Sequence, residues 1–208
     1  MHLIDRIWFF GDSYCADDSE GTYIDKLSKF HNAEIMHLGQ KGHGPISTYE
    51  RFLEQQSHIE QSTDLLIFLW SGQHRKLDKH DLHLPEQGVV MHDEFVNPNY
   101  NIALKNYYKF IHNKRHDSII FKGLVNATMF ECDFKGYKNL QYFCFPEEAS
   151  IFKNNFNMSY FSLTRDDYNN FSNEDVKYFK NHLSPDGHND FVDKINNDFK
   201  DKYEKSIN

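Results

Sequence analysis

The segment Asp64–Trp70, which reads DLLIFLW, constrains the fold more than any other stretch of this 208-residue chain. After one acidic residue it is continuously apolar, with no alternation between polar and apolar positions. A strand with this pattern is covered on both faces, which is typical of the parallel sheets of α/β proteins. We therefore expect Asp64–Trp70 to be a central strand with helices packed on both sides.

Other segments of the chain alternate between strand and helix patterns. Four further apolar runs predict strands, at Leu3–Phe10, Ala33–Leu38, Ser118–Val125 and Leu140–Phe145. Apolar residues at helical spacing predict helices around Tyr23–Phe30, after Pro45, over Ile102–Ile111, and after Ser184-Pro185, where the stripe is Val192, Ile195, Phe199 and Tyr203. This alternation predicts a three-layer α/β/α fold with a parallel sheet of about five strands.

The length and the pattern predict one domain over residues 1–208, with long loop excursions at about 76–101 and 146–172. Hydrophobic residues at 39% and aromatic residues at 16% argue against disorder. A net charge of −8 argues against nucleic acid or an anionic membrane as a partner. The chain has no run of roughly 20 apolar residues and no signal-peptide pattern, so we expect a soluble, cytoplasmic protein.

Cysteine and histidine usage gives no sign of a metal or cofactor. The three cysteines, Cys15, Cys132 and Cys144, are too few and too scattered for a disulfide framework or a zinc-ligand pattern. The histidine-rich segment 80–92 has spacings that match no common ligand pattern. We therefore expect a protein that works without a metal or an organic cofactor.

The residues Gly11-Asp12-Ser13 directly follow the first predicted strand. Ligands bind outside the carboxyl ends of the strands in open α/β sheets, and a sharp turn after a strand exposes a serine oxygen above the sheet. Ser13 is therefore a candidate nucleophile. The same tripeptide is also a common turn or helix cap, so both interpretations stay open at this point.

Three other segments stand at strand ends or helix starts. The segment 38–44, LGQKGHG, follows the second predicted strand, and a backbone N–H there is suited to donate to an oxyanion. Polar Ser71, Gln73, His74 and Arg75 follow the third strand. His182 precedes the last helix, where a histidine is suited to act as a general base, and His188 lies about one turn inside that helix. Taken alone, each of these segments could also be an ordinary loop without a catalytic role.

In their order along the chain, these segments resemble the motifs of the SGNH, or GDSL-type, hydrolases. That family has GDS after strand one, a glycine block after strand two, a G-x-N-D block after strand three and a D-x-x-H block before the final helix. Here FFGDS, LGQKGHG and HLSPDGH resemble the first block, the second and the tail of the fourth. The resemblance implies flavodoxin-like strand order and ester hydrolysis through an acyl-enzyme. It makes Ser13 the nucleophile, His182 the base, and Ser13, Gly42 and a side chain from Gln73 or His74 the oxyanion hole.

Two blocks depart from the family pattern. The third reads Ser71-Gly72-Gln73-His74 and lacks the oxyanion asparagine, and Phe179 stands where the family has its triad aspartate. The candidates for the acid, or for an alternative base, are Asp175, Asp186 and His188, and a backbone carbonyl is a further candidate to orient His182. Three functions stay open: a serine hydrolase acting on a carbohydrate or small-molecule ester, a catalytically impaired binding or accessory protein, and an acyltransferase using the same serine.

Overall fold

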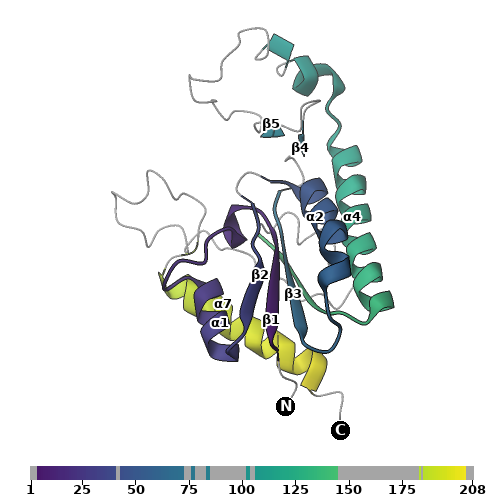
Figure 1. Ribbon diagram of the computed structural model, residues 1–208. Helices are drawn as coiled ribbons and strands as arrows, with labels where there is room; N and C mark the ends of the chain where they lie inside the picture. Colours follow the sequence, from purple (N-terminus) through teal and green to yellow (C-terminus); the bar gives the residue numbers. More distant parts are fainter. Residues whose placement is uncertain are drawn as a thin grey trace.

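A parallel sheet lies at the centre of the chain. The computed structural model describes residues 4–40, 43–72, 76–77, 83–84, 102–103, 106–144, 183 and 185–204. Its main sheet contains β1 (Arg6–Gly11), β2 (Glu34–His37), β3 (Asp64–Trp70) and β6 (Lys138–Phe143), all parallel, in the order β2-β1-β3-β6 (Figure 1). This confirms the α/β fold with flavodoxin-like order, but with four strands among the described residues rather than five.

Two pairs of helices cover the two faces of this sheet. Helices α1 (Tyr23–His31) and α7 (Pro185–Phe199) pack on one face, and α2 (Pro45–Gln55) and α4 (Lys114–Lys135) pack on the other (Figure 1). Short 3₁₀ segments cover Ser13–Cys15 (η1) and Gln56–His58 (η2), and short π-helices cover Tyr107–Ile111 (η4) and Lys200–Glu204 (η5). Within the described ranges, every helix is too short or too polar to cross a bilayer.

The prediction of a strand over Ser118–Val125 is wrong, because this run lies inside α4. The Asn113 side chain accepts hydrogen bonds from the backbone at the start of the helix, and Gly136, with φ of 68°, ends it. An apolar run of this length fits a buried strand and a buried helix segment equally well. The distinguishing signal extends beyond the run. It consists of the two caps and of the helical spacing that continues through the buried positions Asp117, Phe121, Val125, Thr128 and Cys132.

The two long excursions are only partly described. In the first, β4 (Lys76–Leu77) and β5 (His83–Leu84) form a small antiparallel ladder separate from the main sheet. The rest of 76–101, and all of 146–172, lie outside the described residues. Of the helix predicted over Ile102–Ile111, the described part contains helical positions at 102–103 and 106 and the π-helix η4.

Alternate residues of the central strands supply the two halves of the core. On the α1/α7 face, the strands contribute Ile7, Phe9, Leu65, Ile67, Leu69, Leu140 and Tyr142. On the α2/α4 face, they contribute Trp8, Phe10, Leu66, Phe68, Trp70 and Phe143. The two tryptophans lie near opposite ends of this second face: the indole N–H of Trp8 donates to Asp64 at 2.8 Å, and that of Trp70 donates to Gln141 at 2.7 Å. Both faces of the sheet are therefore closed by apolar packing, as the pattern of β3 predicts.

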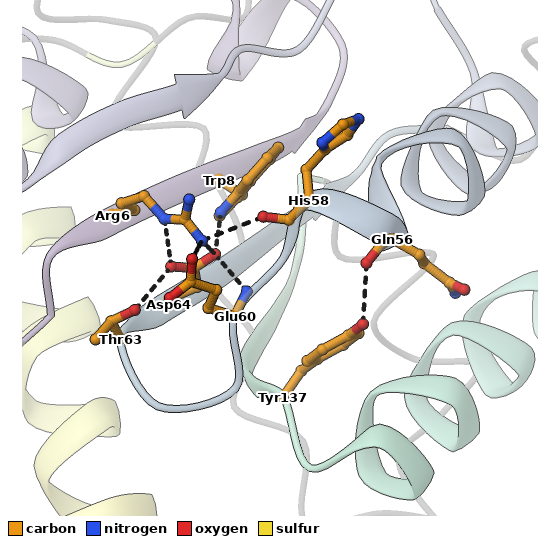
Figure 2. Close-up of polar contacts among 8 residues, drawn as sticks. All are labelled: Arg6, Trp8, Gln56, His58, Glu60, Thr63, Asp64 and Tyr137. Carbon is orange, nitrogen blue, oxygen red and sulfur yellow. Dashed lines mark hydrogen bonds and ion pairs between the residues drawn. The ribbon is translucent and has the colours of Figure 1, made fainter.

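At the amino end of the sheet, the buried carboxylate of Asp64 collects donors from several elements (Figure 2). The Arg6 guanidinium donates to its two oxygens at 2.7 and 2.8 Å. The Trp8 indole, the Glu60 backbone N–H and the Thr63 hydroxyl donate at 2.8, 2.9 and 3.3 Å. A buried charge is stable only when it is paired and hydrogen-bonded, and here it ties β1 to the start of β3.

Candidate functional site

Ser13 lies on a tight turn directly after the carboxyl end of β1. It is the first residue of the 3₁₀ segment η1, and Asp12 caps this segment by accepting a hydrogen bond from the Tyr14 backbone N–H at 3.0 Å. Asp12, Tyr14 and Cys15 are buried, whereas Ser13 is partly exposed. The turn therefore presents the serine at the surface while its neighbours anchor it in the core.

Hydrogen bonds from other elements fix the backbone of this turn. The Tyr23 hydroxyl, from α1, donates to the Tyr14 carbonyl at 2.9 Å. After β2, the Gly39 N–H donates to the Cys15 carbonyl at 2.8 Å, and the Gln40 N–H donates to the Gly11 carbonyl at 3.1 Å. The conformation around Ser13 is thus set by donors from α1 and from the end of β2.

Two glycines allow the strand ends to approach so closely. A Cβ on Gly11 would lie 2.6 Å from the Leu69 carbonyl oxygen and 2.7 Å from the Cys15 sulfur. A Cβ on Gly39 would lie 2.3 Å from that sulfur and 2.7 Å from the Asp12 carbonyl oxygen. Real Cβ atoms do not approach other heavy atoms this closely. The ends of β1, β2 and β3 can therefore pack together at this turn only because positions 11 and 39 are glycines.

The segments after β2 and β3 also meet. The buried Ser71 hydroxyl, just past β3, donates to the His43 carbonyl at 3.4 Å. Gly44 and Pro45 follow and open α2, so the amino end of that helix stands at the carboxyl edge of the sheet. A helix amino end in this place favours negative charge nearby. Three of the four segments singled out in the sequence therefore converge at the carboxyl end of the sheet.

The fourth segment reaches the same region through Leu183 and α7. Leu183 lines a small apolar pocket. The other lining residues are Tyr14, Leu69, Tyr142, Phe143, Cys144 and Phe191. Tyr14 follows Ser13 in the chain and Leu183 follows His182. The pocket is therefore lined by one residue adjacent in sequence to the predicted nucleophile Ser13 and by one adjacent to the predicted base His182.

His188 contacts the start of α1. Its Nδ1 accepts a hydrogen bond from the Tyr23 backbone N–H at 3.1 Å, and its ring stacks on that of Tyr23 with centroids 5.9 Å apart. The neutral ring therefore carries its proton on Nε2 in this arrangement. Asp186 lies exposed in the first turn of α7.

Cys15, the nearest thiol in sequence to Ser13, is fully buried. Burial raises the pKa of this thiol well above its ordinary value, and the nearby Asp12 carboxylate raises it further. A nucleophilic cysteine needs a thiolate, so Cys15 stays a neutral packing residue and does not compete with Ser13. Among the described residues, no group of His, Cys, Asp and Glu side chains is arranged to hold a metal ion.

The structure describes only part of the predicted site. Ser13, Asp186 and His188 fall within it, whereas Gly42, Gln73, His74, Asp175 and His182 lie outside the described residues. Sequence reasoning missed two supports of the turn, the Tyr23 hydroxyl and the close approach at Gly39. A signal for the first was present, since a tyrosine on the apolar stripe of a helix needs a partner for its hydroxyl once it is buried.

Comparisons with known proteins find likeness in structure only. No family model matches the chain, and no curated protein matches it. Among solved structures, a lipolytic protein of the G-D-S-L family from Desulfitobacterium hafniense superposes with a TM-score of 0.52 at 11% identity, over 91% of this chain and 97% of that one. An acetyl xylan esterase gives 0.52 at 15% identity, over 91% and 97%.

A third solved structure, a mutant acetyl-xylooligosaccharide esterase from Geobacillus, superposes with a TM-score of 0.51 at 12% identity. It covers 96% of this chain and 96% of its own. Likeness that spans both chains nearly end to end at such low identity reflects a shared fold. Together with the order β2-β1-β3-β6 and the Gly11-Asp12-Ser13 turn after β1, it shows that this chain has an SGNH hydrolase-like fold.

Proposed function

We propose that the chain is a serine ester hydrolase that works through an acyl-enzyme at Ser13. The observation that carries this proposal is the position of Ser13. It is the partly exposed residue of a turn that is otherwise buried, and the turn is fixed by hydrogen bonds from α1 and from the end of β2. A nucleophile held in a fixed geometry reacts faster, since less orientational freedom is lost on the way to the transition state.

In the proposed mechanism, the Ser13 Oγ attacks the acyl carbonyl while His182 accepts its proton. His182 then returns this proton to the leaving alcohol, and water hydrolyses the acyl-enzyme by the same steps. The backbone N–H groups of Ser13 and Gly42, with a side chain from Gln73 or His74, stabilise the oxyanion. The amino end of α2 adds favourable electrostatics for negative charge in this region.

The acid that orients His182 is proposed to be Asp175 or Asp186, with a backbone carbonyl as the alternative. Asp186 is exposed in the first turn of α7, four positions after His182 in the sequence. For His188 to replace His182 as the base, its Nε2 would have to act, because its Nδ1 accepts the Tyr23 N–H. Replacing Asp175 and Asp186 singly by Asn separates these candidates by the size of the loss in kcat.

The proposed substrate is a small acyl group, such as acetyl, esterified to a carbohydrate or another small molecule. Two structural neighbours are described as esterases of acetylated xylan or xylooligosaccharides, which supports the same class. We also propose that the protein acts as a soluble, cytoplasmic enzyme.

The test is hydrolysis of 4-nitrophenyl acetate by the wild type, by Ser13→Ala and by the control Ser19→Ala, whose serine is exposed in the next loop. We expect Ser13→Ala to lower kcat by at least about a thousandfold and Ser19→Ala to leave it unchanged. A fluorophosphonate probe should label the wild type and the control at Ser13. If the wild type is as inert as Ser13→Ala and takes no label, the chain is a binding or accessory protein on this fold.

An acyltransferase would pass the same serine tests. Product analysis in the presence of a sugar acceptor distinguishes it, because an acyltransferase forms the acylated sugar in preference to the free acid. We expect the free acid to dominate.

A further inference from the structure

Helix α4 carries two apolar stripes, and the fold uses only one of them. The first stripe packs against α2 and the sheet and contains Phe121, Val125 and Cys132 among its buried residues. The second consists of Ile119, Ile120, Gly123, Ala127, Phe130 and Phe134. At about 100° per residue, its centre lies nearly opposite the first stripe. We call this second set the outer stripe, and Figure 1 shows α4 at the side of the molecule, beside α2.

The large members of the outer stripe are well exposed. Phe130 is 68% and Phe134 is 76% exposed, and Ile119 and Ile120 are 57% and 51% exposed. The rings of Phe130 and Phe134 stack on each other, with centroids 6.1 Å apart and planes 10° from parallel. Single exposed apolar residues are common, but a contiguous row along about 22 Å of helix is typical of an interaction surface.

The middle of the outer stripe is small. A Cβ on Gly123 would meet nothing within 4 Å, so packing within this chain does not require glycine there. Glycine in a helix interior costs about 1 kcal/mol relative to alanine. Gly123 and Ala127 lie between two bulky ends, so the outer stripe has the outline of a shallow saddle. Small residues in such a position let another helix approach closely.

This outline is complementary to itself when it is turned end for end. If a second α4 lies antiparallel, with the two Ala127 residues at the centre, Phe130 of one chain falls over Gly123 of the other. Phe134 then falls over Ile119 and Ile120. A two-fold interface must match a surface with its own rotated copy, and the outer stripe meets this condition.

The charges beside the outer stripe favour the same arrangement. Lys122 and Asp133 flank it on one side, near its two ends, and 11 positions separate them, too far for them to pair within one helix. In an antiparallel pair, residues on the same flank face each other, so Lys122 of each chain lies close to Asp133 of the other. A parallel pair does not bring these two residues together.

We propose that the outer stripe of α4 binds a second copy of this chain as an antiparallel, two-fold homodimer. The four large side chains expose on the order of 500 Å², against about 800 Å² per partner in a standard interface. Because this area is smaller than that of a standard interface, we expect a weak, reversible dimer. It lies on the α2/α4 face and does not depend on the proposed hydrolysis at Ser13.

The test is sedimentation equilibrium of the full chain from low to high micromolar concentration. The wild type should show a concentration-dependent dimer, and Phe130→Glu with Phe134→Glu should weaken it by at least about tenfold. Phe30→Glu is the matched control, because Phe30 is also exposed, at 61%, but lies on α1 across the sheet. It should leave the dissociation constant unchanged. Circular dichroism checks that each variant is folded.

A charge exchange tests the orientation. Lys122→Glu and Asp133→Lys should each weaken the dimer several-fold, because each places like charges together across the interface, and the double variant should restore it. A wild type that stays monomeric at every concentration overturns the proposal. So does a monomer that binds lipid vesicles through these phenylalanines, or a dimer that the double charge exchange does not restore.

Discussion

The two ends of the parallel sheet use the same strands in opposite ways. At the amino end, Asp64 is buried and saturated by the Arg6 guanidinium, the Trp8 indole and further donors (Figure 2). At the carboxyl end, backbone hydrogen bonds hold the turn, and the side chain they present, Ser13, is partly exposed. At the amino end, buried polar side chains stabilise the fold. At the carboxyl end, backbone hydrogen bonds fix the position of the Ser13 hydroxyl. Changes at the first should act on folding, and changes at the second on chemistry.

The largest effect on stability is expected from Asp64→Ala at the amino end. It leaves the Arg6 guanidinium and the buried Trp8 N–H without their acceptor, so we expect unfolding to become easier by about 3 kcal/mol or more. Urea denaturation measures this loss. Hydrolysis per folded molecule should not change, because Ser13 lies at the other end of the sheet.

Glu60→Ala is the matched control for this variant. Its carboxylate also contacts Arg6, at 3.4 Å, but the side chain is 65% exposed. An exposed ion pair contributes little, so we expect a change within about 0.5 kcal/mol. Equal losses for the two variants would show that Asp64 is not the anchor of the amino end.

The next effect is expected from Gly39→Ala at the carboxyl end. The new methyl would meet the Cys15 sulfur and the Asp12 carbonyl oxygen, so the turn that carries Ser13 must shift. We expect a loss of about 1–3 kcal/mol in unfolding free energy, together with a fall in kcat. The paired variant Gly123→Ala has open space for its methyl and should stabilise the monomer by up to about 1 kcal/mol. A Gly39→Ala protein with wild-type kcat would contradict the role of this contact.

Two tyrosines provide a direct comparison of the two ends. The Tyr23 hydroxyl donates to the Tyr14 carbonyl at 2.9 Å beside Ser13, and the Tyr137 hydroxyl donates to the Gln56 carbonyl at 3.1 Å at the amino end. Replacing either by Phe should lower the free energy of unfolding by about 1 kcal/mol. Only Tyr23→Phe should also lower kcat for ester hydrolysis. Equal kcat values for the two variants would show that the Tyr23 hydroxyl does not help to position Ser13.

The smallest effect concerns pH and His37, the last residue of β2. Burial lowers the pKa of its imidazole, and the Arg51 cation lowers it further. The Nε2 atom is buried and has no hydrogen-bond partner among the described residues. Because the unfolded chain binds this proton more tightly, His37 favours the folded state above its ordinary pKa of about 6.5, and this contribution is lost as the pH falls toward the folded pKa.

We therefore expect His37→Phe, which keeps a ring against Phe10, to lose less thermal stability than the wild type between about pH 7 and pH 5. The melting temperature measured against pH checks this. The lowered pKa of His31 acts in the same direction and remains in the variant, so the slope should shrink and not vanish. Parallel curves for the two proteins would contradict the assignment.

The sequence predicted the central strand best. Asp64–Trp70 has the predicted bounds, because its six apolar residues lie between the polar residues before Asp64 and the Ser71-Gly72 break, and a run this short without helical caps favours a strand. Ser118–Val125 looked similar and is helical, because the caps at Asn113 and Gly136 set the element and lie outside the run. An apolar run therefore identifies a strand or a helix only when the capping residues on either side of it are considered as well.

The place of Ser13 after the first strand was predictable from the sequence, but the contacts that support its turn were not. The glycine and the serine that follow the first strand can be read directly from the sequence, so Ser13 could be identified as a candidate. The close approach at Gly39 and the hydroxyl of Tyr23 depend on where β2 and α1 lie in space, which follows from the whole fold. The roles of His182, Gly42, Gln73, His74 and Asp175 stay predictions.

The positions of Trp8 and Trp70 have a practical consequence. They are the only two tryptophans in the chain, and both are buried, one hydrogen-bonded to Asp64 and the other to Gln141. Each end of the sheet therefore has its own intrinsic fluorophore. Trp8→Phe leaves an emission signal from the carboxyl end alone, and Trp70→Phe leaves one from the amino end alone. Opening of the region around Ser13 can in this way be followed separately from unfolding at the opposite end, without any added label.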